Sequence, residues 1–191
     1  MTPAIEIDSN LMLRVKDGDM QCFENLLERH RTPLVHFLYR MVHNHAVAEE
    51  LAQEVFLRVY CSRENYKPSA KFTTWLYRIA TNLALNWLRD KRRERMEESL
   101  DAVTLLGFRR QISDTTPDVH KNMLQREYMD EIKQAIFSLP DRQKAAVLMH
   151  KYEEMDYWQI AESMGCSMTT VKALLFRAYT TLRTRLAHIA A

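Results

Sequence analysis

Apolar side chains recur every three or four positions along much of the 191-residue chain. From residue 8 to about residue 92 this spacing predicts consecutive helices. Asp8 or Ser9 is expected to cap the first helix, Asp19 to cap the second, and Pro33 to begin a separate one. The segment AVAEELAQEVFLRVY predicts one buried stripe, made of Ala48, Leu51, Ala52, Val55, Phe56 and Val59.

The periodicity stops between residues 93 and 124, where Gly107, Pro117 and mixed charges occur. We interpret this stretch as a flexible linker, and its apolar piece LDAVTLLGF as a candidate transient helix or partner contact. From 125 to 191 the helical pattern returns. A short helix, a glycine-containing turn and a longer helix predict a helix-turn-helix, with Asp156 and Gln159 as a capping box.

The predicted fold is therefore all-α. It consists of two small helical domains, over 8–92 and 125–191, which the linker joins. The second domain contains the helix-turn-helix.

The last helix has two unlike faces. At 100° per residue, Val171, Leu175 and Ala178 gather on a core side, while the opposite side carries cations, hydroxyls and Phe176. Between Gly165 and Leu186 there is no acid, although soluble surface helices usually mix Glu with Lys. Small residues let a helix lie deep in a DNA major groove, and an outward Phe can contact a thymine methyl. This face therefore predicts duplex DNA binding.

The long helix TTWLYRIATNLALNWLRDKRR also has a polar stripe opposite a wide apolar face. Asparagine is a poor interior helix former, so two asparagines four residues apart indicate a function such as bonding to base edges. Trp75 at its start can stack on a single-stranded base, and RDKRR can contact phosphates. The stripe predicts binding of single-stranded DNA through Trp75, Arg78, Asn82, Asn86 and Arg89.

Composition excludes several classes of protein. Three glycines stand where average usage would give roughly thirteen, which argues against a strand-rich fold. No GxGxxG or GxxxxGKS/T motif and no nucleophile–base set occurs, so we expect neither an enzyme nor a cofactor. His43 and His45 are the closest histidine pair, but no further ligand follows at a motif spacing, so no metal site is expected.

The cellular location is predicted from cysteines and the N-terminus. Cys22, Cys61 and Cys166 are odd in number and widely spaced, as is typical of reduced thiols. MTPAIEIDSN lacks the regions of a signal peptide, and the apolar runs are too short for a membrane span. We therefore expect a cytoplasmic protein without membrane insertion.

Four segments resemble, in order, the signature segments of bacterial extracytoplasmic-function (ECF) sigma factors. They are AEELAQEVFLRVY, FTTWLYRIATNLALNWLRDKRR, SLPDRQKAAVL and YWQIAESMGCSMTTVKALLFRA. The resemblance implies a two-domain initiation factor. Its first domain would bind the β′ clamp helices of core RNA polymerase and open the −10 promoter element, and its second domain would read the −35 element as duplex. A regulatory anti-sigma factor is also implied.

The resemblance also implies residues for each role. The core-binding helix matches the segment that presents Glu50, Gln53, Glu54 and Leu57 away from the buried stripe. The flipped-base loop matches NYKPSAKF, which contributes Tyr66, Lys71 and Phe72 to the −10 site. The upstream-element helix matches the segment that contains Thr169, Thr170, Lys172, Ala173, Phe176 and Arg177.

Some positions depart from the family pattern. The usual recognition run resembles TVKSRLxRAR, and here Ala173, Leu174 and Tyr179 replace Ser, Arg and Arg. No member's upstream sequence preference is therefore carried over. Two other hypotheses stay open at this point, a stand-alone helix-turn-helix regulator and a factor that binds polymerase without reading a promoter.

Overall fold

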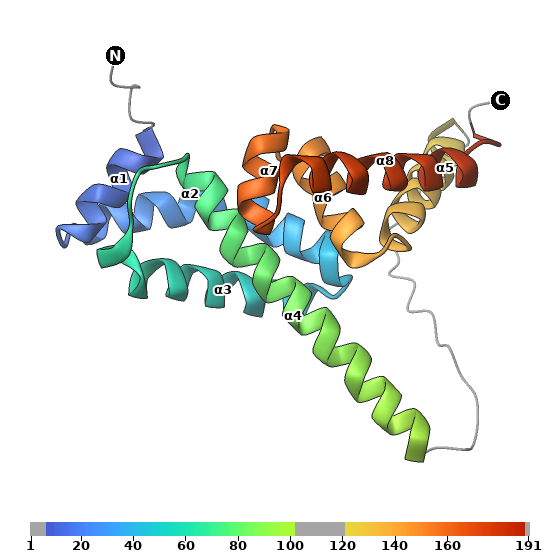
Figure 1. The fold of residues 1–191 in the computed structure, drawn as a ribbon, viewed down its shortest axis with the longest axis horizontal. Helices are drawn as coiled ribbons and strands as arrows, with labels where there is room; N and C mark the ends of the chain where they lie inside the picture. Colours follow the sequence, from blue (N-terminus) through green and yellow to red (C-terminus); the bar gives the residue numbers. More distant parts are fainter. Residues whose placement is uncertain (1–6, 102–120, 190–191) are drawn as a thin grey trace.

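The computed structural model describes residues 7–101 and 121–189, and all regular structure within them is helical (Figure 1). This confirms the predicted fold class. The helices in chain order are α1 (Ile7–Lys16), α2 (Met20–Val42), α3 (His45–Cys61), the short 3₁₀ helix η1 (Arg63–Asn65), α4 (Phe72–Asp101), α5 (Lys121–Phe137), α6 (Asp141–Lys151), α7 (Tyr157–Met164) and α8 (Met168–Arg185). Among the helices that the structure describes, none has the length and apolar character of a membrane span.

Helices α1 to α4 form the first module, in which α2 packs against α1, α3 and α4. The prediction of a new helix at Pro33 is wrong, because α2 runs unbroken through it. Leu26, Leu34, Phe37 and Met41 keep helical spacing on both sides of the proline and are fully buried. An interior proline removes one backbone hydrogen bond and its ring clashes with the preceding turn. Burial of this continuous apolar stripe offsets that loss of stability.

The prediction that Asp8 or Ser9 caps the first helix is also wrong, since α1 begins at Ile7 and both residues are buried inside it. The other predicted cap is confirmed. The Asp19 carboxylate accepts a hydrogen bond from the Cys22 amide at 3.1 Å. This bond satisfies one of the free amides at the start of α2.

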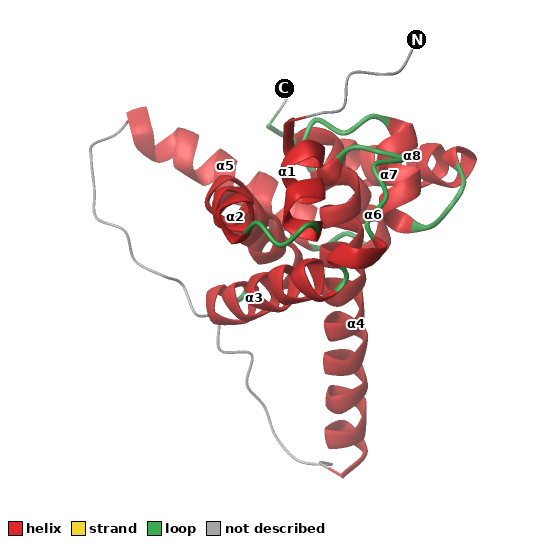
Figure 2. Ribbon diagram, turned by 90° about the vertical axis from the view of Figure 1, so that its left-hand side faces the viewer, coloured by secondary structure: helices red, strands yellow, loops and turns green. Residues whose placement is uncertain are grey.

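Helix α4 extends beyond the expected boundary at residue 92 and ends at Asp101, while α5 already begins at Lys121. Its C-terminal half projects away from the rest of the protein (Figures 1 and 2). Ion pairs Lys91–Glu94 and Arg93–Glu97, at 3.0 and 2.9 Å, support this half. Most of the apolar piece LDAVTLLGF lies outside the described residues.

The second module contains α5 to α8, and the predicted helix-turn-helix is confirmed in α7 and α8. At the start of α7 the Asp156 carboxylate accepts from the Gln159 backbone amide at 2.8 Å, and the Gln159 side-chain oxygen accepts from the Asp156 backbone amide at 2.9 Å, which confirms the capping box. Gly165 ends α7 with φ of +59°, a conformation that favours glycine. The Ser167 hydroxyl accepts from the Thr170 amide at 3.1 Å and begins α8.

The two modules pack directly on each other, with α7 and α6 against α4 and α6 against α2. Lys144 of α6 is 2% exposed, and its ammonium donates to the Met41 carbonyl at the end of α2 at 2.9 Å. The same ammonium lies 4.5 Å from the centre of the Phe137 ring. Burial lowers the pKa of Lys144.

Candidate nucleic-acid interface

The polar stripe of α4 is exposed as predicted. Arg78, Asn82, Asn86 and Arg89 are all exposed, whereas Trp75 and Ile79 on the same stripe are partly buried. On the other side of the helix, Leu76, Ala80 and Ala84 are fully buried. The two asparagine amides therefore face outward, where they can bond to a ligand.

A pocket of about 180 Å³ lies at the start of this stripe. Side chains from the η1–α4 loop and the first turns of α4 form it, together with one residue of α7. The lining residues are Asn65, Tyr66, Lys67, Ser69, Ala70, Thr74, Trp75, Arg78 and Glu162. An aromatic ring beside cations in a small pocket is the arrangement that holds an unstacked base.

Tyr66 and Phe72, expected to contact DNA, are 4% and 0% exposed. Phe72 has no surface through which it could touch a strand in this conformation, because its ring packs between Trp75 and His30, at 6.1 and 5.3 Å between ring centres. The Tyr66 ring lies 5.0 Å from that of Trp75 and forms a wall of the pocket. Lys71, in contrast, is exposed.

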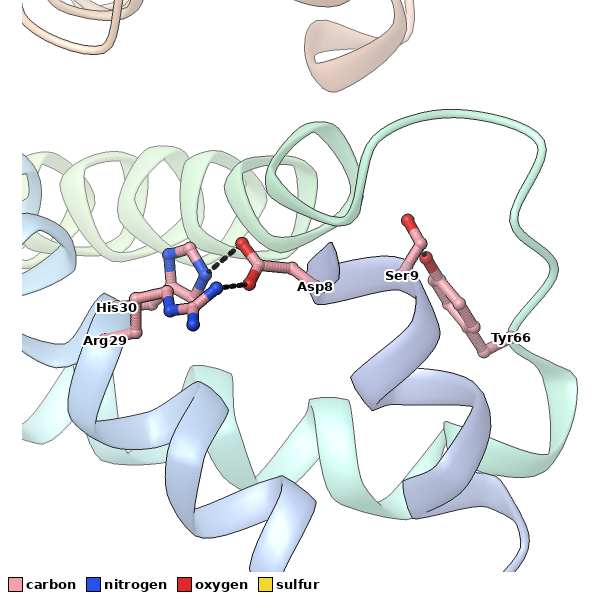
Figure 3. Close-up of polar contacts among 5 residues, drawn as sticks. All are labelled: Asp8, Ser9, Arg29, His30 and Tyr66. Atoms are coloured by element: carbon pink, nitrogen blue, oxygen red, sulfur yellow. Dashed lines mark hydrogen bonds and ion pairs between the residues drawn. The ribbon is translucent and has the colours of Figure 1, made fainter. Parts of the chain in front are cut away.

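Helix α1 holds this loop through contacts that sequence reasoning missed (Figure 3). The Tyr66 hydroxyl donates to the Ser9 hydroxyl at 3.1 Å. Next to Ser9, the Asp8 carboxylate lies 2.9 Å from Nε2 of His30 and pairs with Arg29. These partners are more than 20 residues apart in the chain, so no local spacing indicates them.

The outer face of α3 brings the predicted polymerase-binding residues together. Glu50, Gln53, Glu54 and Leu57 line one hollow of about 600 Å³, and Trp87 of α4 forms part of its wall. Leu57 is 56% exposed, and Glu54 pairs with Arg58 at 2.7 Å.

A second, more apolar groove of about 510 Å³ lies between α2 and α3, and it was not predicted. Phe23, Leu27, Val35 and Phe56 are among its lining residues, and Gln53 and Leu57 border both hollows. Met20, which also lines this groove, is 49% exposed. The α3 face thus combines carboxylates with apolar surface, which suits a basic amphipathic helix.

The outward face of α8 matches the prediction from its helical projection. Thr169, Thr170, Lys172, Phe176 and Arg177 are exposed, and Ala173 is partly buried. Phe176 is 73% exposed, the largest fraction among the exposed large hydrophobic residues that the structure describes. The Thr170 hydroxyl lies 2.9 Å from that of Ser167, so it also supports the helix start. On the core side Val171, Leu175 and Ala178 are buried, as expected.

Two departures from the family pattern have a structural reason. Tyr179 is partly buried, and its hydroxyl lies 3.1 Å from Nδ1 of His150 on α6. Burial raises the pKa of Tyr179, so this phenol stays protonated and can donate to the imidazole. Leu174 packs against the core. Both residues therefore join α8 to its own module.

The cations late in α4 are mostly paired. Arg92 reaches Asp141 of α6 at 2.6 Å, and Arg93 reaches Glu97 on the next turn. Exposed pairs of this kind contribute little to stability and can exchange for phosphate contacts. The described residues contain no group of three or more metal-ligating side chains.

Both modules match known families at the positions described above. Residues 26–94 match sigma-70 region 2, and residues 129–182 match sigma-70 region 4. The chain is 30% identical over 176 residues to the ECF RNA polymerase sigma factor SigW of Bacillus subtilis (strain 168). The aligned residues cover 91% of this chain and 93% of SigW. The chain belongs to the ECF sigma factors.

Other relatives agree with this assignment. The ECF RNA polymerase sigma-E factor of Escherichia coli (strain K12) is 30% identical over 176 residues and 90% of each chain. RNA polymerase sigma factor CarQ of Myxococcus xanthus is 34% identical over 172 residues, or 90% of this chain and 93% of CarQ. Sigma factors are not enzymes, and the match of both modules to sigma regions sets aside a stand-alone regulator.

Solved structures show the same fold. CnrH in complex with the cytosolic domain of CnrY aligns with a TM-score of 0.70, at 17% identity, over 96% of this sigma factor and 99% of that chain. The sigma factor RpoE in complex with the anti-sigma factor NepR from Bartonella quintana aligns with a TM-score of 0.63 at 20% identity. The alignment covers 86% of this sigma factor and 96% of the RpoE chain.

Proposed function

We propose that this sigma factor directs core RNA polymerase to promoters by two separate contacts with DNA. The first module takes a base of the −10 element into the pocket at the start of α4, and the second reads the −35 duplex with α8. The observation that carries the proposal is the acid-free α8 face, with Phe176 73% exposed beside Lys172 and Arg177. An outward phenylalanine between cations has no role in the core of its own module.

At the −10 element the structure suggests a division of roles. Trp75 stacks on the base, and the exposed Lys71 and Arg78 contact phosphates. Asn82, Asn86 and Arg89 then bind the following strand. Tyr66 forms a wall of the pocket beside the base, whereas the fully buried Phe72 supports Trp75 from behind.

At the −35 element Lys172, Phe176 and Arg177 reach the base edges from the middle of α8. Thr169 and Thr170 lie in its first turn, where hydroxyls and free backbone amides suit phosphate contacts. The partly buried Ala173 keeps the helix surface low, which allows close approach to the groove.

Core polymerase binds the face of α3. The β′ clamp helices would place basic side chains against Glu50, Gln53 and Glu54, and apolar side chains against Leu57. We also infer a cytoplasmic location, where polymerase and promoter are found, and control by an anti-sigma factor. Support for the latter comes from RpoE, which shares the fold and was solved with the anti-sigma factor NepR.

Reconstitution with core polymerase on a promoter library tests the proposal. Run-off transcripts should map to specific starts that share two sequence elements. Phe176→Ala should lose selectivity at the upstream element alone, and Trp75→Ala should impair promoter opening without weakening core binding. Tyr128→Ala, which removes an exposed aromatic on α5, is the matched control and should change neither. If no complex with core polymerase forms, the proposal is wrong.

A further inference from the structure

Helix α7 lies against the strand-binding end of α4, although the two belong to different modules (Figure 1). The buried Ser163 hydroxyl of α7 donates to the Thr74 carbonyl at 3.0 Å. Just before α7, the Glu153 carboxylate accepts from the Tyr77 hydroxyl. Burial raises the pKa of both of these groups. The contact surface on α4 therefore includes the residues that flank Trp75.

Buried polar groups without a partner occur on the helices that form the contact between the modules. Among the described residues, four buried side-chain oxygens have no hydrogen-bond partner, and they belong to Thr74, Thr81, Gln143 and Glu162. Thr74 and Thr81 are one heptad apart on α4, on the side that also carries Tyr77, while the other two belong to α6 and α7. Orphaned polar groups lower the stability of an interface. Separation of the modules would let water or another ligand satisfy them.

Glu162 connects this interface to the candidate base pocket. It lines the pocket together with Lys67 and Arg78, and its Oε2 is buried without a partner among the described residues. The second module thus adds a carboxylate to a pocket whose lining also includes Lys67 and Arg78, the latter proposed to contact a phosphate of the bound strand. A like charge at this position repels the strand.

We propose that α7 covers this surface of α4 in the free protein, and that single-stranded DNA competes with α7 for the same surface. The proposal rests on the proposed function, because it takes the pocket as the −10 base site. While α7 packs on α4, which we call the closed arrangement, the Glu162 carboxylate repels a strand from the pocket. Binding of a strand therefore requires α7 to separate from α4. The closed protein therefore cannot use both DNA-reading surfaces at once.

Removal of the Glu162 charge gives the first test. The probe is a fluorescently labelled single-stranded DNA 15-mer of random sequence, titrated with the full chain in the absence of polymerase. Glu162→Gln keeps the shape of the side chain and should bind the probe about fivefold more tightly, with a reduced dependence on salt. Asp130→Asn removes an exposed carboxylate from α5 of the same module and is the matched control. Equal affinities for both variants would overturn the role of Glu162.

The second test follows the separation of the modules. Donor and acceptor dyes on the exposed Cys61 and on Ala187→Cys report the distance between modules, with Cys166→Ser to prevent a third label. Saturating single-stranded DNA should lower the transfer efficiency. Binding of DNA with no change in transfer would show that α7 and the strand do not compete.

A variant that opens the interface without touching the pocket completes the design. Arg40 stacks over the Tyr152 ring at 4.1 Å, so Glu153→Arg places a second cation nearby and should open the protein and raise strand affinity. Glu154→Arg makes the same charge change one residue later, at an exposed position, and should do neither.

These measurements distinguish failure of the competition between α7 and the strand from failure of the proposed function. An open Glu153→Arg protein that still fails to bind the strand would overturn the competition. Failure of the proposed function would instead appear as loss of the complex with core polymerase, which is measured without reference to closure.

Discussion

The two helices that we propose to read DNA are built in opposite ways. Helix α8 presents its reading face freely, since neither Lys172 nor Arg177 forms an ion pair with any residue that the structure describes. The start of α4, in contrast, is covered by the second module. Its first turns contact α7, its pocket contains Glu162, and Arg92 and Arg93 are paired with acids.

The difference reflects what each helix is proposed to bind. A duplex presents a preformed groove, so an open and rigid face is enough. A single strand exists only after melting, and a pocket that is open at all times would bind any single-stranded nucleic acid. Under the proposed function, the covered start of α4 and the open face of α8 would impose an order, with duplex contact before strand capture.

The largest effect should come from two neighbouring residues on α8. Leu175 is 2% exposed and Phe176 is 73% exposed. Leu175→Ala should lower the free energy of unfolding by about 2–5 kcal/mol, because it leaves a cavity in the core. Phe176→Ala should change it by less than about 0.5 kcal/mol, as expected for an exposed site. Urea denaturation measures both, and similar losses would mean that Phe176 packs in the core.

An intermediate effect is expected at Asn82 on α4. Asn82→Ala should stabilise the protein by a few tenths of a kcal/mol, because alanine is the better helix former, and should reduce promoter opening about tenfold. Asn25→Ala makes the same change at an exposed position of α2 and should give the stability gain alone. Permanganate footprinting of the open complex measures the opening. Equal opening by both variants would argue that the stripe does not bind DNA.

The smallest effect concerns Lys144 between the modules. Its pKa is lowered in the folded protein. In the pH window between this lowered pKa and the ordinary lysine pKa near 10.4, the unfolded chain therefore binds more protons than the folded protein. The free energy of unfolding should therefore rise with pH in this window, by less than about 1.4 kcal/mol per pH unit. Denaturation series up to about pH 10, where tyrosines begin to ionise, measure the slope.

Matched lysine variants isolate this effect. Lys144→Met should flatten the slope, whereas Lys151→Met, at an exposed position of the same helix, should leave it unchanged. A slope that survives in Lys144→Met would assign it to another group.

The sequence predicted the features that depend on local spacing. The buried stripe of α3, the two faces of α8, the Asp156–Gln159 capping box and the exposed asparagines of α4 all follow from the 3.6-residue period or from a cap motif. Each of these depends on residues within one or two turns of one another.

The features that were missed depend on contacts between distant residues. Lys144 meets Met41 across 103 positions, and Ser163 meets Thr74 across 89. Asp8 and Ser9 carry the residue types of a helix cap, but tertiary partners at His30 and Tyr66 decide their role. The burial of Tyr66 and Phe72 depends in the same way on α1 and α2, which local spacing cannot place.

The continuity of α4 would set the length of the DNA strand that we propose it binds. From Trp75 to Arg89 the helix rises about 21 Å, at 1.5 Å per residue, which equals about six stacked nucleotides at 3.4 Å each. Thr169 to Arg177 on α8 spans about 12 Å, or between three and four base pairs. Because α4 and α8 are each a single unbroken helix, a nucleotide inserted into the −10 or the −35 element would shift every contact beyond the insertion.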